Sequence, residues 1–209
     1  MRAIRPRSLT GLHPRSKATL LTAVMALVVC CRVQAEPPNK PLDAGSGNLQ
    51  HDGRHDFDFE VGRWKAHVKR LGHRLSHSTD WDELSGTVVT RTLPMLEGWN
   101  ESEMQVDSPT SGSHMKLLAV RLYNPSTHQW SIYGSSIEGG VFDPPMIGQF
   151  RDGRGEFYSR DTYQGRAIFV RFIWQKIGAN RTKLEQAFSE DGGKTWETNW
   201  IYEGERLAE

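Results

Sequence analysis

The chain has 209 residues, with 26 Lys and Arg against 25 Asp and Glu, and its two cysteines are Cys30 and Cys31. Residues 1–35 contain six of the basic residues and no acidic one, so the remaining 174 residues carry 20 bases and 25 acids, a formal net charge of −5. A mildly acidic, cysteine-free domain excludes disulfides, thiolate chemistry and cysteine metal sites, and it disfavours binding to nucleic acid.

Residues 1–35 have the organisation of a secretory signal peptide. Basic residues precede a mostly apolar run of 14 residues from Ala18 to Cys31, and Val33-Gln34-Ala35 fits a cleavage pattern. The run is shorter than the about 20 residues of a membrane-spanning helix. We therefore expect no membrane span, cleavage near Ala35, and a periplasmic or secreted protein. A lipid anchor at Cys30 or Cys31 is the alternative, although Val29 is larger than the residue usual before a lipidated cysteine.

The remainder divides into a tether and one domain. Residues 36–55 are rich in proline, glycine and polar residues without an apolar period, which is typical of a flexible tether. Residues 56–209 alternate between apolar and polar side chains. In "GRWKAHVKR", for example, Trp64, Ala66 and Val68 share one face, which predicts a half-buried strand. The expected strands after it are 84–93, 99–106, 115–123, 129–137, 156–163, 166–175, 182–189 and 197–203.

Short turns rich in Gly, Asn and Asp separate these strands, and no long helical pattern interrupts them. Many short strands joined locally predict an all-β antiparallel meander. Closing nine or ten strands into a single β-barrel removes exposed edges, so we expect a barrel. Residues 70–80 lack alternation and are the one expected helix. The Pro-Pro segment 141–148 is an ordinary connection or a stiff rim at the barrel mouth.

The stretch "SEDGGKTWETNW" (189–200) fits the S-x-D-x-G-x-T-W spacing of the Asp-box of sialidase-type propellers. A propeller needs four to eight four-stranded blades, for which this chain is too short. We therefore expect a hairpin, in which Asp191 accepts backbone N–H groups, the glycines take positive φ, and Trp196 packs on the neighbouring strand.

Several stretches together resemble a bacterial family of lipocalin-like (calycin-type) proteins known only as a domain of unknown function. They are "FDFEVGRWKAHVKRL", "TDWDELSGT", "VRLYNPSTHQWSIY", "GQFRDGRGEFYSRDTYQGRAIFVRFIW" and "EQAFSEDGGKTWETNWIYEGER". The resemblance covers about residues 57–206 and implies a calycin-like barrel with an internal cavity, without implying an activity. Lipocalin-type barrels also open with G-x-W, here Gly62 and Trp64, and a late basic residue, here Arg206, covers the Trp as a structural plug.

Seven Trp, five Tyr and eight Phe indicate either a large core or an aromatic-lined cavity. Alternation places Trp130, Gln186, Trp200 and Tyr202 on inward faces and Asn199 outward, whereas it does not decide between Phe157 and Tyr158. We expect Gln186 and Tyr202 to bond each other or a ligand, because buried polar groups are paired. The candidate ligand-binding residues are Trp130, Tyr158, Arg171, Gln186, Trp200, Tyr202 and Arg121.

Arg121 and Arg171 are flanked by apolar residues on both sides, in "LLAVRLY" and "IFVRFIW". Each is either an exterior Arg with a packed stem or an inward Arg that neutralises a ligand carboxylate or phosphate. An inward Arg with Tyr and Glu nearby would also suit acid–base chemistry.

Two histidine pairs, His51 with His55 and His73 with His77, have the i, i+4 spacing that allows a shared metal on a helix. The first pair lies in the tether, and the second depends on a helix at 70–80. We expect no metal and no cofactor. A haem would need an axial His, and no His lies on a late apolar strand.

The sequence thus predicts an exported barrel that binds a small, partly apolar molecule with a polar or anionic group. A small lyase or hydrolase using cavity Arg, Tyr and Glu residues is the first alternative. A filled barrel that acts through its surface is the second.

Overall fold

The computed structural model describes residues 52–136 and 139–208. The predicted signal peptide, its cleavage site, both cysteines, His51 and the tether up to residue 51 lie outside the described residues. Within the described part, no helix is long and apolar enough to cross a membrane.

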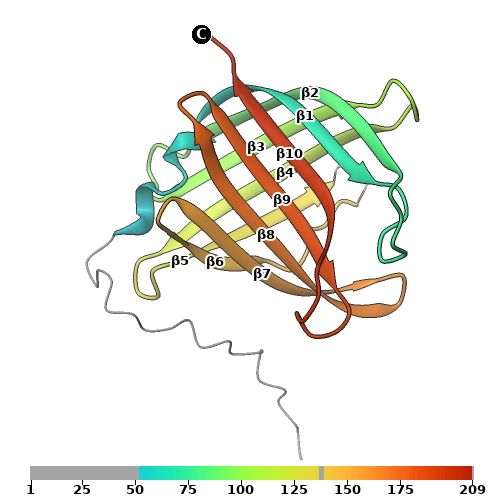
Figure 1. The fold of residues 1–209 in the computed structure, drawn as a ribbon. Helices are drawn as coiled ribbons and strands as arrows, with labels where there is room; N and C mark the ends of the chain where they lie inside the picture. The colour runs from blue at the N-terminus through green and yellow to red at the C-terminus, as the bar shows by residue number, and fades with distance from the viewer. Residues whose placement is uncertain (1–51, 137–138, 209) are drawn as a thin grey trace, which may run out of the picture. The chain divides into compact units, whose positions relative to one another are not determined.

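Ten antiparallel strands form a closed barrel in which each strand pairs with its neighbours in sequence and β1 pairs with β10 (Figure 1). This confirms the predicted all-β meander and its closure. The strands are β1 Gly62–Leu71, β2 Trp81–Thr92, β3 Trp99–Asp107, β4 His114–Asn124, β5 Gln129–Ser136, β6 Met146–Arg151, β7 Arg154–Tyr163, β8 Arg166–Gly178, β9 Arg181–Ser189 and β10 Glu197–Arg206.

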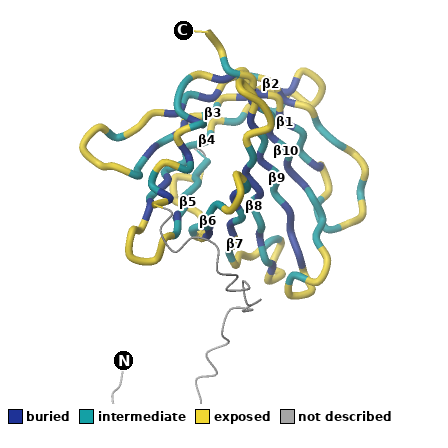
Figure 2. Tube along the Cα trace, turned by 60° about the vertical axis from the view of Figure 1, so that its left-hand side comes forward, coloured by how far each residue is buried: buried dark blue, intermediate teal, exposed yellow. Residues whose placement is uncertain are grey.

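Period-two alternation determines which side chains enter the barrel. In β1, Trp64, Ala66 and Val68 are buried while Arg63 and Lys65 are exposed. Successive side chains of a strand point to opposite faces, so one face of each strand contributes to the interior. Figure 2 shows the result: buried residues follow the strands, and the exposed ones gather in the connections at the two ends.

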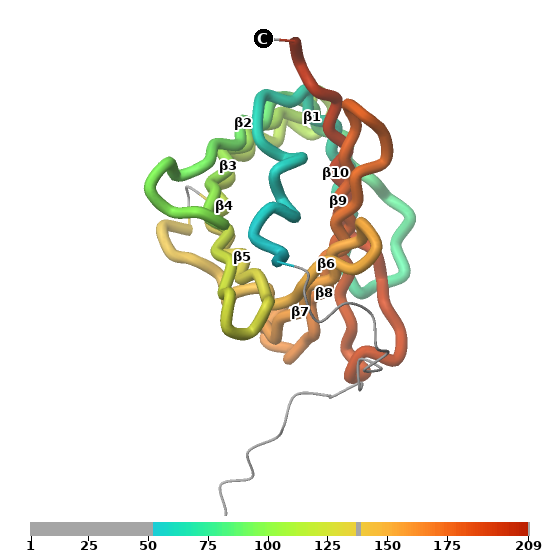
Figure 3. Tube along the Cα trace, turned by 90° about the vertical axis from the view of Figure 1, so that its left-hand side faces the viewer, coloured from blue at the N-terminus to red at the C-terminus, as the bar shows by residue number. Residues whose placement is uncertain are grey.

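Residues 52–60 cover one end of the barrel. They form two short 3-10 helices, η1 Gly53–His55 and η2 Asp58–Glu60, which lie across the opening (Figure 3). Between them Phe57 is completely buried. Gly53 to His55, at the end of the predicted tether, thus belong to this cap, because Gly53 accepts a hydrogen bond from Nε1 of Trp130 at 3.0 Å.

At the same end, Arg206 lies over Trp64 with its guanidinium carbon 4.1 Å from the ring centroid, the contact expected from the sequence. The guanidinium also donates to the carbonyl oxygens of Phe59 and Val61, both at 2.6 Å. Gly62 has φ +124°, and a Cβ there would lie 2.5 Å from Nη1 of Arg206. A glycine is therefore required where the chain passes beneath the plug.

The helix predicted around residues 70–80 is wrong. Strand β1 continues to Leu71, and the following residues form turns in which Leu75 and His77 have positive φ. The carboxylate of Glu197 accepts the backbone N–H groups of both residues. Hydrogen bonds to Glu197 of β10 thus hold this segment in place of a helix. His73 and His77 therefore do not lie one helical turn apart.

The stretch at 189–200 is a hairpin between β9 and β10, as predicted. Asp191 accepts hydrogen bonds from the backbone N–H groups of Lys194 and Thr195, at 3.0 and 2.9 Å. Gly192 and Gly193 have φ of +77° and +86°. These bonds, with those from the hydroxyls of Ser189 and Thr195, lower the pKa of Asp191 well below its ordinary value.

Replacing Asp191 with Asn is expected to destabilise the protein at about pH 7, because one amide oxygen cannot accept all the bonds of a carboxylate. A carboxyl whose pKa is depressed by folding stabilises the native state above its unfolded pKa, and this contribution disappears as the pH falls through the folded pKa. The difference in thermal unfolding temperature between wild type and Asp191→Asn should therefore shrink in strong acid. A difference that is constant with pH would contradict this role.

Candidate functional site

A cavity of about 460 Å³ lies inside the barrel. Most of its wall is apolar, because the inward-facing side chains of the strands around it are mostly apolar. The apolar wall includes Val88, Met104, Met115, Leu117, Ile132, Met146, Ile168, Val170, Phe172, Leu184, Phe188 and Trp200. The cap closes one end, which we call the floor and define by Glu60, Arg121, Trp174 and Tyr202. The other end is the mouth.

Arg121 projects inward from β4 and is 2% exposed. Its Nη1 donates to Oδ1 of Asn100 at 2.9 Å and to Oγ of Ser102 at 2.7 Å. Its guanidinium carbon lies 4.9 Å from the ring centroid of Phe57 and 5.1 Å from that of Trp174. Burial lowers the pKa of Arg121 from its ordinary value. Of the two orientations left open by the sequence, the inward one therefore applies to Arg121.

Glu60 is fully buried on the floor although it comes from the cap, at the end of η2. The Thr182 hydroxyl on β9 donates a hydrogen bond to its carboxylate. Burial raises the pKa of Glu60, and this effect exceeds the opposing influence of Arg121, Thr182 and Arg206. Glu60 could not be identified from the sequence, because in "FDFE" it has the same local pattern as an exposed acid.

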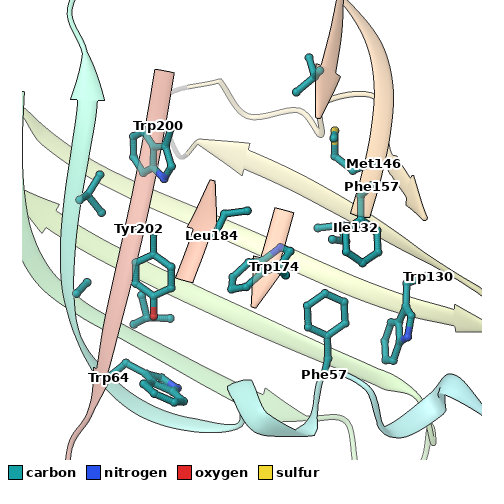
Figure 4. Packing of buried hydrophobic residues seen from close by; sticks show 14 of the residues in the cluster. Phe57, Trp64, Trp130, Ile132, Met146, Phe157, Trp174, Leu184, Trp200 and Tyr202 are labelled. Carbon is teal, nitrogen blue, oxygen red and sulfur yellow. The ribbon is translucent and has the colours of Figure 1, made fainter. Parts of the chain in front are cut away.

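Four buried polar atoms of the floor have no hydrogen-bond partner within the described protein: Oε2 of Glu60, Nε of Arg121, Nε1 of Trp174 and Oη of Tyr202. The Tyr202 and Trp174 rings lie 6.1 Å apart and belong to the same cluster (Figure 4). Burial, and then the charge of Glu60, raise the pKa of Tyr202, so it is a neutral phenol. A buried polar atom without a partner costs about 1–3 kcal/mol. The floor therefore has hydrogen-bonding capacity that the protein does not use itself.

Gln186 lines the cavity as expected, but it bonds neither Tyr202 nor any other floor residue in the structure. Its Nε2 donates to Oδ1 of Asn199 at 2.7 Å. The prediction that Asn199 points outward is wrong, because Asn199 is fully buried. The register between β9 and β10 shifts between Thr198 and Trp200, and this irregularity breaks the simple alternation.

The mouth carries charges of both signs. The guanidinium carbon of Arg74 lies 5.9 Å from the Tyr163 ring and 5.7 Å from the Phe188 ring. Asp143 and Asp161 line the same end of the cavity, and partial burial together with repulsion by Asp161 raises the pKa of Asp143. Asp143 belongs to the Pro-Pro segment, so this connection forms part of the rim.

Three candidate ligand-binding residues do not line the cavity. Trp130 is inward and buried, but it packs in the cap, with its ring centroid 5.0 Å from that of Phe57. Tyr158 is 43% exposed and donates from its hydroxyl to Glu156 at 3.0 Å. Arg171 stacks on Trp196 at 4.6 Å and lies opposite Tyr158 on the outer face of the barrel. Placing these three in the ligand site is therefore wrong.

The structure brings Arg121, Gln186, Trp200 and Tyr202 together around the cavity. It adds Trp174 and Glu60 to the floor and Arg74 to the mouth. Trp174 shares the inward parity of Ile168, Val170 and Phe172 in β8, so alternation alone could have identified it. Among the described residues, no group of three His, Cys, Asp or Glu side chains is placed to hold a metal ion.

The fold is similar to that of solved β-barrels. The S-type phycobiliprotein lyase CPES from Guillardia theta matches with a TM-score of 0.51 and 12% identity, over 77% of this chain and 95% of that one. EF1p2_mFAP2b bound to DFHBI matches with a TM-score of 0.41 and 8% identity, over 74% and 99% of the two chains. A de novo designed fluorescence-activating β-barrel gives 0.40 and 12%, over 75% and 99%.

No protein-family model and no curated protein matches this chain. At such low identity, the lyase match concerns the fold alone. Together with the strand order, it defines the class of the protein: a closed, ten-stranded, antiparallel β-barrel. This agrees with the calycin-like fold that the family resemblance implies, and it assigns no family.

Proposed function

We propose that the barrel binds a small, partly apolar molecule, with the apolar part against the wall and a polar or anionic group on the floor. The observation that carries this proposal is the cavity of about 460 Å³, whose apolar wall ends at a buried polar floor with unpaired atoms. Ligand pockets of about 300–1,000 Å³ combine a mostly apolar lining with a few placed polar groups in this way.

The cavity favours ligand binding over the alternative of a filled barrel that acts through its surface. A filled barrel leaves few voids larger than a water molecule. The cavity exceeds the about 300 Å³ at which ligand pockets begin.

A second candidate function is acid–base catalysis on a bound molecule. Glu60, Arg121 and Tyr202 occur on one floor, and burial raises the pKa of Glu60, the direction that suits a general acid. This corresponds to the small lyase or hydrolase considered from the sequence. A molecule that is recovered chemically changed after incubation with the protein would favour catalysis over binding.

Filling the cavity tests the binding proposal. Ala119 faces the cavity from β4, so Ala119→Phe should occupy part of the ligand volume. We expect wild type to bind 1-anilinonaphthalene-8-sulfonate, an anionic aromatic probe, at unit stoichiometry, and Ala119→Phe to bind it at least about tenfold more weakly, which is about 1.4 kcal/mol. Fluorescence titration measures both constants. The matched control is Ala167→Phe, an exposed position on β8. Equal binding by wild type and both variants would place the probe outside the cavity.

The proposal includes export, with removal of residues 1–35 and a periplasmic or secreted location. The basic start, the apolar run and the small residue Ala35 support it. The intact mass of the protein purified from its own host decides the matter. A chain that begins after Ala35 supports export, a lipid-modified cysteine at its start indicates the anchor, and an uncleaved chain contradicts both.

A further inference from the structure

The floor has more unused donors than acceptors. Nε of Arg121, Nε1 of Trp174 and Oη of Tyr202 are donors without a partner, whereas Oε2 of Glu60 is the single unpaired oxygen without a hydrogen of its own when ionised. A head group that complements this set has to accept several hydrogen bonds. A carboxylate suits it, because its two oxygens offer about four acceptor positions.

The charges along the cavity determine which end such a head group occupies. Among the described residues that line it, the cations are Arg74 and Arg121, and the carboxyl groups are Glu60, Asp143 and Asp161. The mouth thus holds two carboxyl groups with one Arg, which disfavours an anion there. The floor holds one carboxyl group, Glu60, and one cation, Arg121. It lies in the water-excluded part of the barrel, where a charge-assisted bond to Arg121 is strongest.

Glu60 determines whether the floor can accept an anion. The groups that face Glu60 are Arg121 from β4, Thr182 from β9, and Tyr202 and Arg206 from β10. Arg206 is already engaged with Trp64 and two backbone carbonyls. If Glu60 were ionised, a bound carboxylate would be the second negative charge beside the Arg121 guanidinium in a buried space, which is unfavourable.

From this geometry we infer that the ligand is an organic acid that enters carboxylate first and binds against Arg121, and that Glu60 takes up one proton as it binds. The inference rests on the proposed function and goes further by assigning the ligand class, its orientation and a proton linkage. Burial raises the pKa of Glu60, and this direction favours the protonated form. Affinity should then fall by up to tenfold for each pH unit above the Glu60 pKa of the free protein.

The test compares decanoate with 1-decanol, which share an apolar chain and differ in the head group. Calorimetry between about pH 6 and pH 9, where free decanoate is ionised, in buffers of different ionisation enthalpy gives affinities and the number of protons taken up. We expect decanoate to bind with uptake that approaches one proton at the alkaline end, and to bind more tightly than decanol at the acid end. Decanol binding should be independent of pH.

Glu60→Gln mimics the protonated side chain and should bind decanoate without proton uptake, with an affinity that no longer falls as the pH rises. Glu205→Gln removes an exposed carboxyl group on β10 and should behave like wild type. Decanoate binding without proton uptake by wild type, or tighter binding of decanol at every pH, would overturn the inference while the binding function stands. If neither molecule binds, the proposed function fails with it. The wild-type proton count does not depend on the folding of any variant.

Discussion

Phe57→Ala should lower the free energy of unfolding by about 3–5 kcal/mol, the range found when a buried Phe is truncated. Phe57 is 0% exposed at the centre of the cap, and Arg121 stacks on its ring. Its removal would leave a void that the rigid barrel end cannot close, and it would open the floor to water. The rings around it, with centroids at 4.8 to 5.7 Å, are Phe150, Trp130, Phe157 and Trp174.

Urea unfolding followed by tryptophan fluorescence measures this loss. Phe142→Ala is the matched control, because Phe142 is 51% exposed in the connection before β6. Its truncation should change the unfolding free energy by no more than about 0.5 kcal/mol. If both truncations had the same small effect, the 52–60 segment would not be the structural cap described here.

Arg121→Gln should weaken binding of an organic acid by about 10- to 100-fold, whereas Arg171→Gln should leave it unchanged. Loss of a charge-assisted hydrogen bond to a ligand carboxylate corresponds to about 1.5–3 kcal/mol. Arg121 is buried and lines the cavity, while Arg171 lies on the outer face over Trp196. Both arginines are flanked by apolar residues in the sequence. Comparing the two variants therefore isolates the effect of an inward against an outward side chain.

Calorimetric titration with decanoate gives the two affinities, and thermal unfolding shows whether each variant is folded. Arg121→Gln leaves Glu60 buried without its cation, and this lowers stability. The double variant Arg121→Gln with Glu60→Gln removes both charges and serves as the folded comparison. Equal losses in the Arg121 and Arg171 variants would show that the head group does not reach the floor.

Alternation was sufficient to predict the barrel and many of its inward faces, because each strand has one face in the core and one toward solvent. It was not sufficient for Arg121 and Arg171. Residues on both sides of these strands are partly shielded, and Ile173 is 5% exposed although it shares the outward parity of Arg171. Where both faces of a strand are apolar, the sequence pattern does not indicate which face points into the barrel.

Three further differences between the predicted and the observed positions of residues have other physical causes. Trp130 has the expected inward parity, but its height along the barrel axis places it in the cap, and height depends on how the sheet closes. Asn199 follows a register irregularity that alternation cannot represent. Glu60 reaches the floor only because the cap folds across the barrel end, which is a tertiary effect. The plug of Trp64 and Arg206 was accessible from the resemblance, since both residues match its motif.

Native mass spectrometry of the protein purified from its own host determines whether the cavity holds a small molecule. We expect an added mass at unit stoichiometry that is released on denaturation, is identified as an organic acid, and is absent or reduced in Ala119→Phe. A clean apo mass, combined with no thermal shift by decanoate, decanol or a panel of metabolites, would contradict the proposed binding of a small molecule.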